Sequence, residues 1–222
     1  MFESLLNFWK GKDFLIQVFD EFKNMLVDSQ EMFEAVVTKL VRNEEVIGLK
    51  DKIYDLDKKV NSLEKDIRTR VAKHLLLNPS VDVTACLLLM SVVKDAERLG
   101  DYCKNLYEVT TIIKKPIDEK VYKAWFGDMD VEVVKLFKNT KKAFIESNED
   151  KAAISWDFKG KIGKACDEIL EKVSKSNLSV NEAVCFALMA RYYKRITSHL
   201  TNIATSVILP ISDLDYFDEK RK

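Results

Sequence analysis

The residues with the clearest chemical potential are two acidic side chains four positions apart, Glu97 and Asp101. On a helix this spacing places both carboxylates on one face. The preceding segment carries a second pair with the same spacing, Asp57 and Asn61. If the two segments pack as antiparallel helices, four oxygen-bearing side chains converge, and such clusters suit hard cations such as Mg²⁺, Mn²⁺, Fe or Ca²⁺. The spacing therefore predicts a metal site at one helix crossing.

The same carboxylates have a simpler interpretation as part of a solvated helix face. Lys94 and Lys104 each stand within one helical turn of the acidic pair and can form salt bridges with it. In a chain with 36 acidic and 36 basic residues, an acidic pair on its own is weak evidence for metal binding. The residues alone leave both interpretations open.

The two histidines, His74 and His199, offer no catalytic arrangement. A ferritin-like di-iron bundle needs Glu three residues before each histidine, and the residues there are Val71 and Ile196. Two histidines and four cysteines without a CxxC pair also provide no Ser-His-Asp or Cys-His set. We therefore expect a protein that is not an enzyme, in which His199 bonds to a backbone carbonyl or a carboxylate.

Long amphipathic helices must position these residues, because helix breakers are few and widely spaced. The 222 residues include only six Gly and three Pro, whereas a sheet protein of this length needs many more turns. Between the breakers, apolar residues recur at steps of three and four, as in the stripe from 53 to 75. The pattern predicts six long helices. Asn78 is the expected cap of the third, and Ser179 forms a capping box with Glu182 at the sixth.

The six predicted helices form two copies of one three-helix unit. The third and sixth segments align at a shift of 97 residues, so that Arg98 meets Arg195, and the second and fifth align at a shift of 102. We therefore predict an all-α fold of two tandem three-helix bundles related by internal duplication. The predicted units are residues 12–115 and 118–209.

Charge and hydropathy narrow the range of partners. The formal net charge is zero, so we expect no nucleic-acid partner and no general attraction to an anionic membrane. The longest apolar run, 83–93, is shorter than the ~20 residues that a membrane-spanning helix needs. Residues 1–10 lack the features of a signal peptide, yet they are apolar enough to dock on a membrane, a transporter, a dimer mate or their own bundle. This composition fits a cytoplasmic protein in which the four cysteines are buried as small hydrophobic side chains.

Three segments resemble signature motifs of the PhoU family of phosphate-signalling proteins. Residues 97–102, which read Glu-Arg-Leu-Gly-Asp-Tyr and are followed by Asn105, are similar to the family's hallmark segment. Residues 57–64, on the preceding helix, are also similar to a segment of that family. The family's other signature contains Arg-Tyr, a second Arg, His and Thr-Asn-Ile-Ala, and it is similar to residues 191–204. The resemblance extends over about residues 13–209 and implies two three-helix bundles side by side.

The resemblance also implies a way of acting. A PhoU-like protein would be a non-enzymatic cytoplasmic regulator of phosphate uptake that contacts a phosphate transporter ATPase or a sensor kinase. It would associate peripherally with the membrane through these partners and would form a homodimer. Two alternatives stay open, a regulator of a sodium- or proton-coupled phosphate carrier and a metal-binding helical bundle with a storage or hydrolytic role.

The resemblance further implies metal ligands, because an acidic residue followed four positions later by Asp holds iron or zinc clusters in that family. Carried over by position, the first unit offers four ligands for iron, zinc or magnesium: Asp57, Asn61, Glu97 and Asp101. In the second unit Lys194 stands where the first has Glu97, and an ammonium group repels a metal ion. We therefore expect metal in the first unit only, with Lys194 neutralising Asp157 or another nearby acid.

Overall fold

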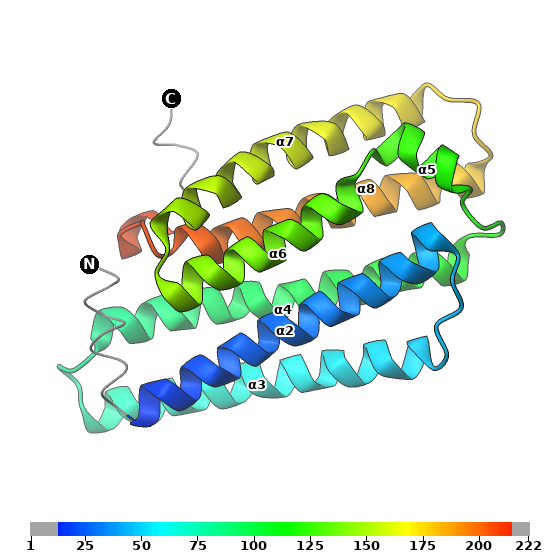
Figure 1. Cartoon of the computed structure of the whole chain (residues 1–222). Helices are drawn as coiled ribbons and strands as arrows, with labels where there is room; N and C mark the ends of the chain where they lie inside the picture. The colour runs from blue at the N-terminus through cyan, green and yellow to red at the C-terminus, as the bar shows by residue number, and fades with distance from the viewer. Residues whose placement is uncertain (1–12, 215–222) are drawn as a thin grey trace.

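The computed structural model describes residues 13–214 as a bundle of helices (Figure 1). Seven α-helices and one short 3₁₀ helix lie in this range, and it contains no strand. Their bounds are α2 (Asp13–Arg42), α3 (Leu49–Leu77), α4 (Val83–Ile112), α5 (Glu119–Phe126), α6 (Met129–Glu146), α7 (Glu149–Ser174), α8 (Val180–Thr205) and η1 (Ile211–Asp213). The all-α fold expected from the sequence is confirmed.

The helices form two bundles that lie side by side. Helices α2, α3 and α4 pack on one another, as do α6, α7 and α8, while α5 contacts α7. Across the boundary α4 lies against α8 and α2 against α6, which leaves α3 and α7 on the outer sides (Figure 1). Aromatic rings cross this boundary, since Phe22 lies 4.6 Å from Phe144 and Phe33 lies 5.8 Å from Tyr193, measured between ring centroids. One hydrophobic core therefore extends through both bundles.

The apolar stripe predicted for the second helix faces this core. Four of its residues on α3 are fully buried: Ile53, Val60, Ile67 and Val71. The other three are partly buried and pack against the core: Leu56, Leu63 and Leu75. All four cysteines are buried as expected, and burial raises the pKa of the Cys166 thiol to about 12. The cysteines therefore serve as small hydrophobic side chains.

Two of the predicted helix starts have different outcomes. The capping box of α8 is confirmed, because the Ser179 hydroxyl accepts from the Glu182 amide at 3.3 Å and the Glu182 carboxylate accepts from the Ser179 amide at 3.1 Å. The prediction that Asn78 caps the next helix is wrong. Asn78 ends α3 instead, where its amide donates to the carbonyl of His74 at 2.9 Å. A turn then leads to Asp82, which has a φ of 61° and immediately precedes the first residue of α4.

The fourth predicted helix is divided into the short α5 and the longer α6. Gly127 separates them with φ 59° and ψ −134°, a conformation that glycine adopts at no steric cost and that other residues avoid. Its amide still donates to the carbonyl of Lys123 at 3.0 Å, which closes the last turn of α5. In the first unit the corresponding helix, α2, continues without a break for 30 residues.

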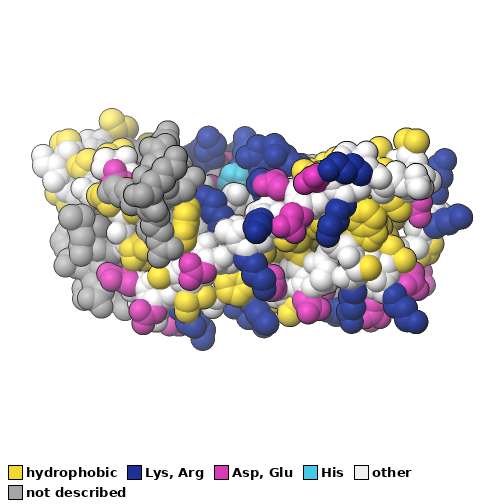
Figure 2. Space-filling view, turned by 90° about the horizontal axis from the view of Figure 1, so that it is seen from above, with side chains coloured by type: hydrophobic (Ala, Val, Ile, Leu, Met, Phe, Trp, Pro, Cys, Tyr) yellow, Lys and Arg dark blue, Asp and Glu magenta, His cyan; other side chains and the backbone are white. Residues whose placement is uncertain are grey.

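The surface carries both signs of charge in close proximity. Figure 2 shows Lys and Arg side chains interspersed with Asp and Glu side chains on the face seen from above, in keeping with a net charge of zero. Within residues 13–214, the helices are all too short or too polar to cross a membrane. The apolar stretch 1–10, for which the sequence suggested a docking role, lies outside the described residues.

Candidate functional site

The predicted site of the first unit lies where α3 and α4 approach each other closely. Gly100 on α4 faces α3, and a Cβ atom at this position would lie 3.4 Å from Cγ1 of Val60 and 3.9 Å from Oδ1 of Asp57. A methyl group would fit there in ordinary van der Waals contact, and a larger side chain would have little room. Asp57 lies at this contact, and its side chain is only 8% exposed.

Lys104 connects carboxylates of both helices at this crossing. Its Nζ donates to Oδ2 of Asp57 at 2.7 Å and lies 3.5 Å from Oδ1 of Asp101. Burial by itself would lower the pKa of Lys104, but the hydrogen bond and charge of Asp57, together with Asp101, outweigh burial and raise the pKa. Oδ1 of Asp57 is buried and has no hydrogen-bond partner among the described residues. The crossing thus contains a cationic side chain and one unsatisfied buried oxygen.

Glu97 and Asp101 share the outer face of α4, as their spacing predicted. Arg98 contacts both, with Nε 3.6 Å from Oε2 of Glu97 and Nη1 donating to Oδ2 of Asp101 at 3.0 Å. Burial raises the pKa of Glu97, and the negative charges of Asp101, Glu64 and Asp57 raise it further while Arg98 opposes them. The carboxylates of Asp57, Glu97 and Asp101 therefore lie close enough to interact electrostatically.

The structure connects three of the four predicted ligands in pairs, because Lys104 contacts Asp57 and Asp101 while Arg98 contacts Glu97 and Asp101. Asn61 is half-buried on α3 and takes no part in the ion pairs that Lys104 and Arg98 form at this crossing. No group of three or more His, Cys, Asp or Glu side chains between residues 13 and 214 is arranged to hold a metal ion. Metal binding by the first unit stays a prediction, and the unsatisfied oxygen of Asp57 is the feature that supports it.

A change at Gly100 tests the close approach that forms this site. Gly100→Val is expected to lower the free energy of unfolding by about 1–3 kcal/mol, because a Cβ already contacts Val60 and Asp57 and leaves little room for two further methyl groups. Gly163 on α7 is the matched control, since a Cβ there meets nothing within 4 Å, and Gly163→Val should change stability by no more than about 0.5 kcal/mol. Urea denaturation followed by circular dichroism measures both. Equal losses would contradict a role for Gly100 in helix approach.

The second unit has a lysine–aspartate pair at its corresponding crossing. Nζ of Lys194 on α8 donates to both carboxylate oxygens of Asp167 on α7, at 2.6 and 2.7 Å. The sequence suggested Asp157 or another nearby acid as the partner of Lys194, and the structure pairs it with Asp167. The Lys194 side chain therefore reaches a carboxylate of the neighbouring helix, α7.

A buried polar cluster joins the two units between α4 and α8. Oδ1 of Asp95 lies 2.6 Å from Nδ1 of His199 and accepts from Nδ2 of Asn202 at 3.3 Å. The ring of Tyr102 stacks on the His199 imidazole with centroids 5.5 Å apart. The expectation that His199 bonds to a carboxylate or carbonyl is confirmed. Sequence reasoning did not identify Asp95, because it stands 104 residues earlier in the chain.

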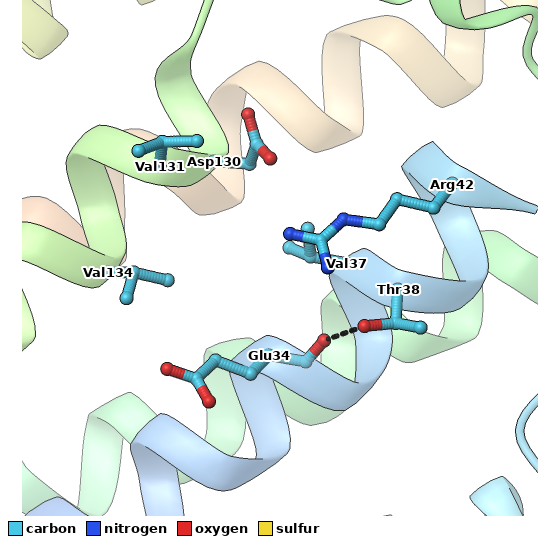
Figure 3. Close-up of a pocket in the computed structure, with 7 residues that line it drawn as sticks. All are labelled: Glu34, Val37, Thr38, Arg42, Asp130, Val131 and Val134. Carbon is cyan, nitrogen blue, oxygen red and sulfur yellow. Dashed lines mark hydrogen bonds between the residues drawn. The ribbon is translucent and has the colours of Figure 1, made fainter. Parts of the chain in front are cut away.

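A pocket of about 280 Å³ opens between α2 and α6 (Figure 3). Glu34, Arg42 and Asp130 supply its charged groups, and the guanidinium of Arg42 extends above Val37 towards α6. The other lining residues are Thr38, Val131 and Val134. The pocket therefore combines charged and apolar surface. The sequence did not reveal it, because the two walls come from different units.

The comparison with protein families gives two matches in this chain. The model of the PhoU domain matches residues 22–110 and again residues 126–207. The first match covers most of α2, α3 and α4, and the second covers α6, α7 and α8. Each bundle therefore corresponds to one copy of the domain.

Individual relatives agree with this result. The chain is 23% identical over 195 residues to the phosphate-specific transport system accessory protein PhoU homolog 1 of Thermotoga maritima, covering 85% of this chain and 83% of the relative. It is 27% identical over 179 residues to the corresponding homolog of Clostridium acetobutylicum, covering 76% of this chain and 77% of the relative.

Solved structures show the same fold. PhoU from Pseudomonas aeruginosa superposes with a TM-score of 0.76 at 18% identity, covering 88% of this chain and 95% of that one. The phosphate transport system regulatory protein PhoU from Streptococcus pneumoniae gives a TM-score of 0.74 at 17% identity, covering 94% and 95%. With a PhoU domain matched over each of its two bundles, the chain belongs to the PhoU family.

Proposed function

We propose that the protein is a non-enzymatic regulator of phosphate uptake and phosphate signalling on the cytoplasmic side of the membrane. The observation that carries this proposal is the match of one PhoU domain to each bundle. The relatives from Thermotoga maritima and Clostridium acetobutylicum bear the name of phosphate-specific transport system accessory proteins. An accessory role in phosphate transport is therefore the function that the family supports.

The proposed mechanism is binding rather than chemistry. Helix surfaces contact a phosphate transporter ATPase or a sensor kinase, and the contact shifts the conformational equilibrium of that partner. The protein associates with the membrane through these partners and acts as a homodimer. The pocket between α2 and α6 supports this mechanism, because a groove lined by both charged and apolar groups can receive a partner's side chain.

The arrangement of the ionisable side chains also favours binding over catalysis. His199 is held by Asp95, and His74 lies 3.1 Å from Asp82. Burial raises the pKa of Cys166, so its thiol is a poor nucleophile.

Affinity capture from cells grown in low and in high phosphate tests the proposed function. We expect the wild-type protein to recover a component of a phosphate transporter or a phosphate sensor kinase. Reversal of charge in the pocket between α2 and α6, by Arg42→Glu, should reduce this recovery. Asp55→Lys, on the exposed surface of α3, is the control and should leave it unchanged. Recovery of neither component under either growth condition would contradict the proposal.

We also propose that a divalent metal ion binds the first unit and not the second. Oxygen ligands for iron, zinc or magnesium would come from Asp57, Asn61, Glu97 and Asp101. The ion would then bridge the protein to a partner, or it would change the charge of the surface that binds the partner. Lys194 disfavours a second ion, because its ammonium group already neutralises Asp167.

Metal analysis of purified variants tests this difference between the units. We expect Glu97→Ala to lose most of the bound metal, because it removes one carboxylate from a small ligand set. Lys194→Ala should retain the amount bound by the wild type, since its crossing contributes no metal. Inductively coupled plasma mass spectrometry of proteins loaded with one metal at a time gives the measurement. Equal loss in the two variants would argue against a site confined to the first unit.

A further inference from the structure

We propose that the pocket between α2 and α6 binds an acidic, amphipathic helix of a protein partner, whose carboxylates pair with Arg42 and Lys138. This inference rests on the regulatory function proposed above and names the chemistry of the partner segment. It is carried by the charges of the pocket and of the adjoining face of α6. The acids that line the pocket are bonded within the protein, whereas the basic groups of this surface have no partner in the described part of the chain.

Arg42 is the cation of the pocket itself. Its side chain is exposed, and its guanidinium extends above Val37 towards α6 (Figure 3). Among residues 13–214, this side chain forms no ion pair and no hydrogen bond. A guanidinium presents several N–H donors in one plane and can bind a carboxylate through two of them. Arg42 is therefore available to a carboxylate that comes from another molecule.

Two lysines extend this positive surface along α6. Val134, which lines the pocket, is followed at steps of four and three by Lys138 and Lys141, and this spacing places all three on one face of the helix. Lys138 is exposed and Lys141 half-buried, and neither forms an ion pair with the described residues. This part of α6 lies against α2, since the ring centroids of Phe137 and Phe33 are 5.8 Å apart. The positive surface therefore continues from the pocket along the boundary between the two helices.

The surroundings of Lys141 favour a bound anion. Burial lowers the pKa of Lys141, the charge of Glu34 opposes this effect, and the positive charges of Lys138 and Lys23 add to it. Burial and like charges thus make the ammonium form less favourable than it is in water. A carboxylate placed beside these lysines would reduce their mutual repulsion.

The two acids that line the pocket are engaged within the protein. Oε1 of Glu34 accepts a hydrogen bond from Nε2 of Gln30 at 2.7 Å. Asp130 is only 8% exposed, and its Oδ1 accepts from the hydroxyl of Tyr122 at 3.5 Å. The three basic side chains of this surface outnumber these two carboxylates and lie without a partner among the described residues, so charge complementarity favours an acidic partner segment.

The spacing of the charged and apolar groups fits a helix. Lys138 stands eight residues, or about 12 Å, beyond Asp130, which lines the pocket with Arg42. Val131 and Val134 lie between these ends, and the side chain of Val131 is 42% exposed. A partner helix with Glu, an apolar residue and Glu at steps of four spans the same length and presents all three on one side. Its acids meet the cations at the two ends, and its apolar side chain covers the valines.

Fluorescence anisotropy with synthetic helical peptides tests the proposal on the full-length protein. The probe is an alanine-based peptide of about 16 residues with Glu, Leu and Glu at steps of four. We expect its Kd to be at least about fivefold lower than that of a peptide with Gln in place of both Glu residues. A peptide of the same composition with Glu, Leu and Glu at steps of two places the leucine on the opposite face, and it should bind as weakly as the Gln peptide.

Variants of the protein locate the binding surface. Arg42→Gln, and Lys138→Gln combined with Lys141→Gln, should each raise the Kd for the acidic peptide at least about fivefold. Arg191→Gln is the matched control, because Arg191 is exposed on α8 and likewise forms no ion pair with the described residues. Its Kd should stay within about twofold of wild type, and far-ultraviolet circular dichroism checks that each variant is folded. Equal affinity for the acidic and Gln peptides, or an equal loss in Arg191→Gln, would overturn the proposal.

The same variants identify other occupants of this surface. If Arg42→Gln abolishes binding to phosphatidylserine vesicles, and the wild type does not bind the peptide, the occupant is a lipid surface and the proposal is overturned. If Arg42→Gln dissociates a dimer in sedimentation velocity, again without peptide binding, the occupant is a second copy of this chain. Affinity capture of a transporter or sensor component that persists without peptide binding would refute this inference alone. Peptide binding without such capture would contradict the proposed regulatory function alone.

Discussion

Asp95→Ala lowers the free energy of unfolding by about 2–4 kcal/mol, as expected for removal of one member of a buried, charge-assisted hydrogen-bond cluster. Asp95 is the shared acceptor for His199 at 2.6 Å and Asn202 at 3.3 Å. The side chains of Asp95 and His199 are only 11% and 18% exposed, so water replaces the lost acceptor poorly. The loss is large because two donors of the second unit lose their partner in the first.

Equilibrium denaturation in urea provides the measurement, with Asp55→Ala as control. Asp55 pairs with Lys58 at 3.7 Å, and both side chains are more than 70% exposed, so its removal should cost no more than about 0.5 kcal/mol. A double-mutant cycle with His199→Ala then isolates the coupling between the units, which we expect at about 1–3 kcal/mol. A loss for Asp95→Ala no larger than that of the control would show that this cluster does not hold the units together.

Tyr193→Ala is expected to lower the free energy of unfolding by about 3–5 kcal/mol, through the cavity left by a fully buried aromatic side chain. Its ring lies 5.8 Å from that of Phe33 in the first unit and 6.0 Å from that of Phe126 in α5. The hydroxyl lies 3.1 Å from that of Tyr122. The substitution therefore removes packing on both sides of the boundary between the bundles.

Two further variants separate packing from hydrogen bonding at this position. Tyr193→Phe keeps the ring and should cost about 1 kcal/mol, the contribution of one buried hydrogen bond. Tyr192→Ala changes the neighbouring, half-buried tyrosine and should cost less than about 1.5 kcal/mol. Chemical denaturation of all three proteins under the same conditions makes the comparison. Similar losses for Tyr193→Ala and Tyr192→Ala would contradict a core shared by the two bundles at Tyr193.

The features that the sequence predicted well are local ones. The stripe that contains Ile53 and Val71 faces the core of α3, and the Ser179–Glu182 box begins α8. Glu97 and Asp101 share a face because helical geometry alone places residues four apart together. These outcomes depend on residues within one or two turns of each other, whose preferences tertiary packing reinforced.

The sequence missed features of two kinds. One is local, since Asn78 has the side chain of a helix cap, yet the turn before α4 runs on to Asp82. The others depend on residues far apart in the chain. Lys104 was expected as a salt-bridge partner of the acidic pair on its own helix, and it also reaches Asp57 on α3. Its second role depends on the packing of α3 against α4, which periodicity does not report.

The sequence by itself determined that this protein is a duplicated set of amphipathic helices with an acidic pair on one face of the first copy, because helix periodicity and spacing are properties of neighbouring residues. Only the tertiary structure decided which charge meets which. The pairing of Asp95 with His199, of Lys194 with Asp167 and of Lys104 with Asp57 depends on how two helices slide and rotate against each other. That register is set by the packing of a core drawn from both bundles, and no local pattern encodes it.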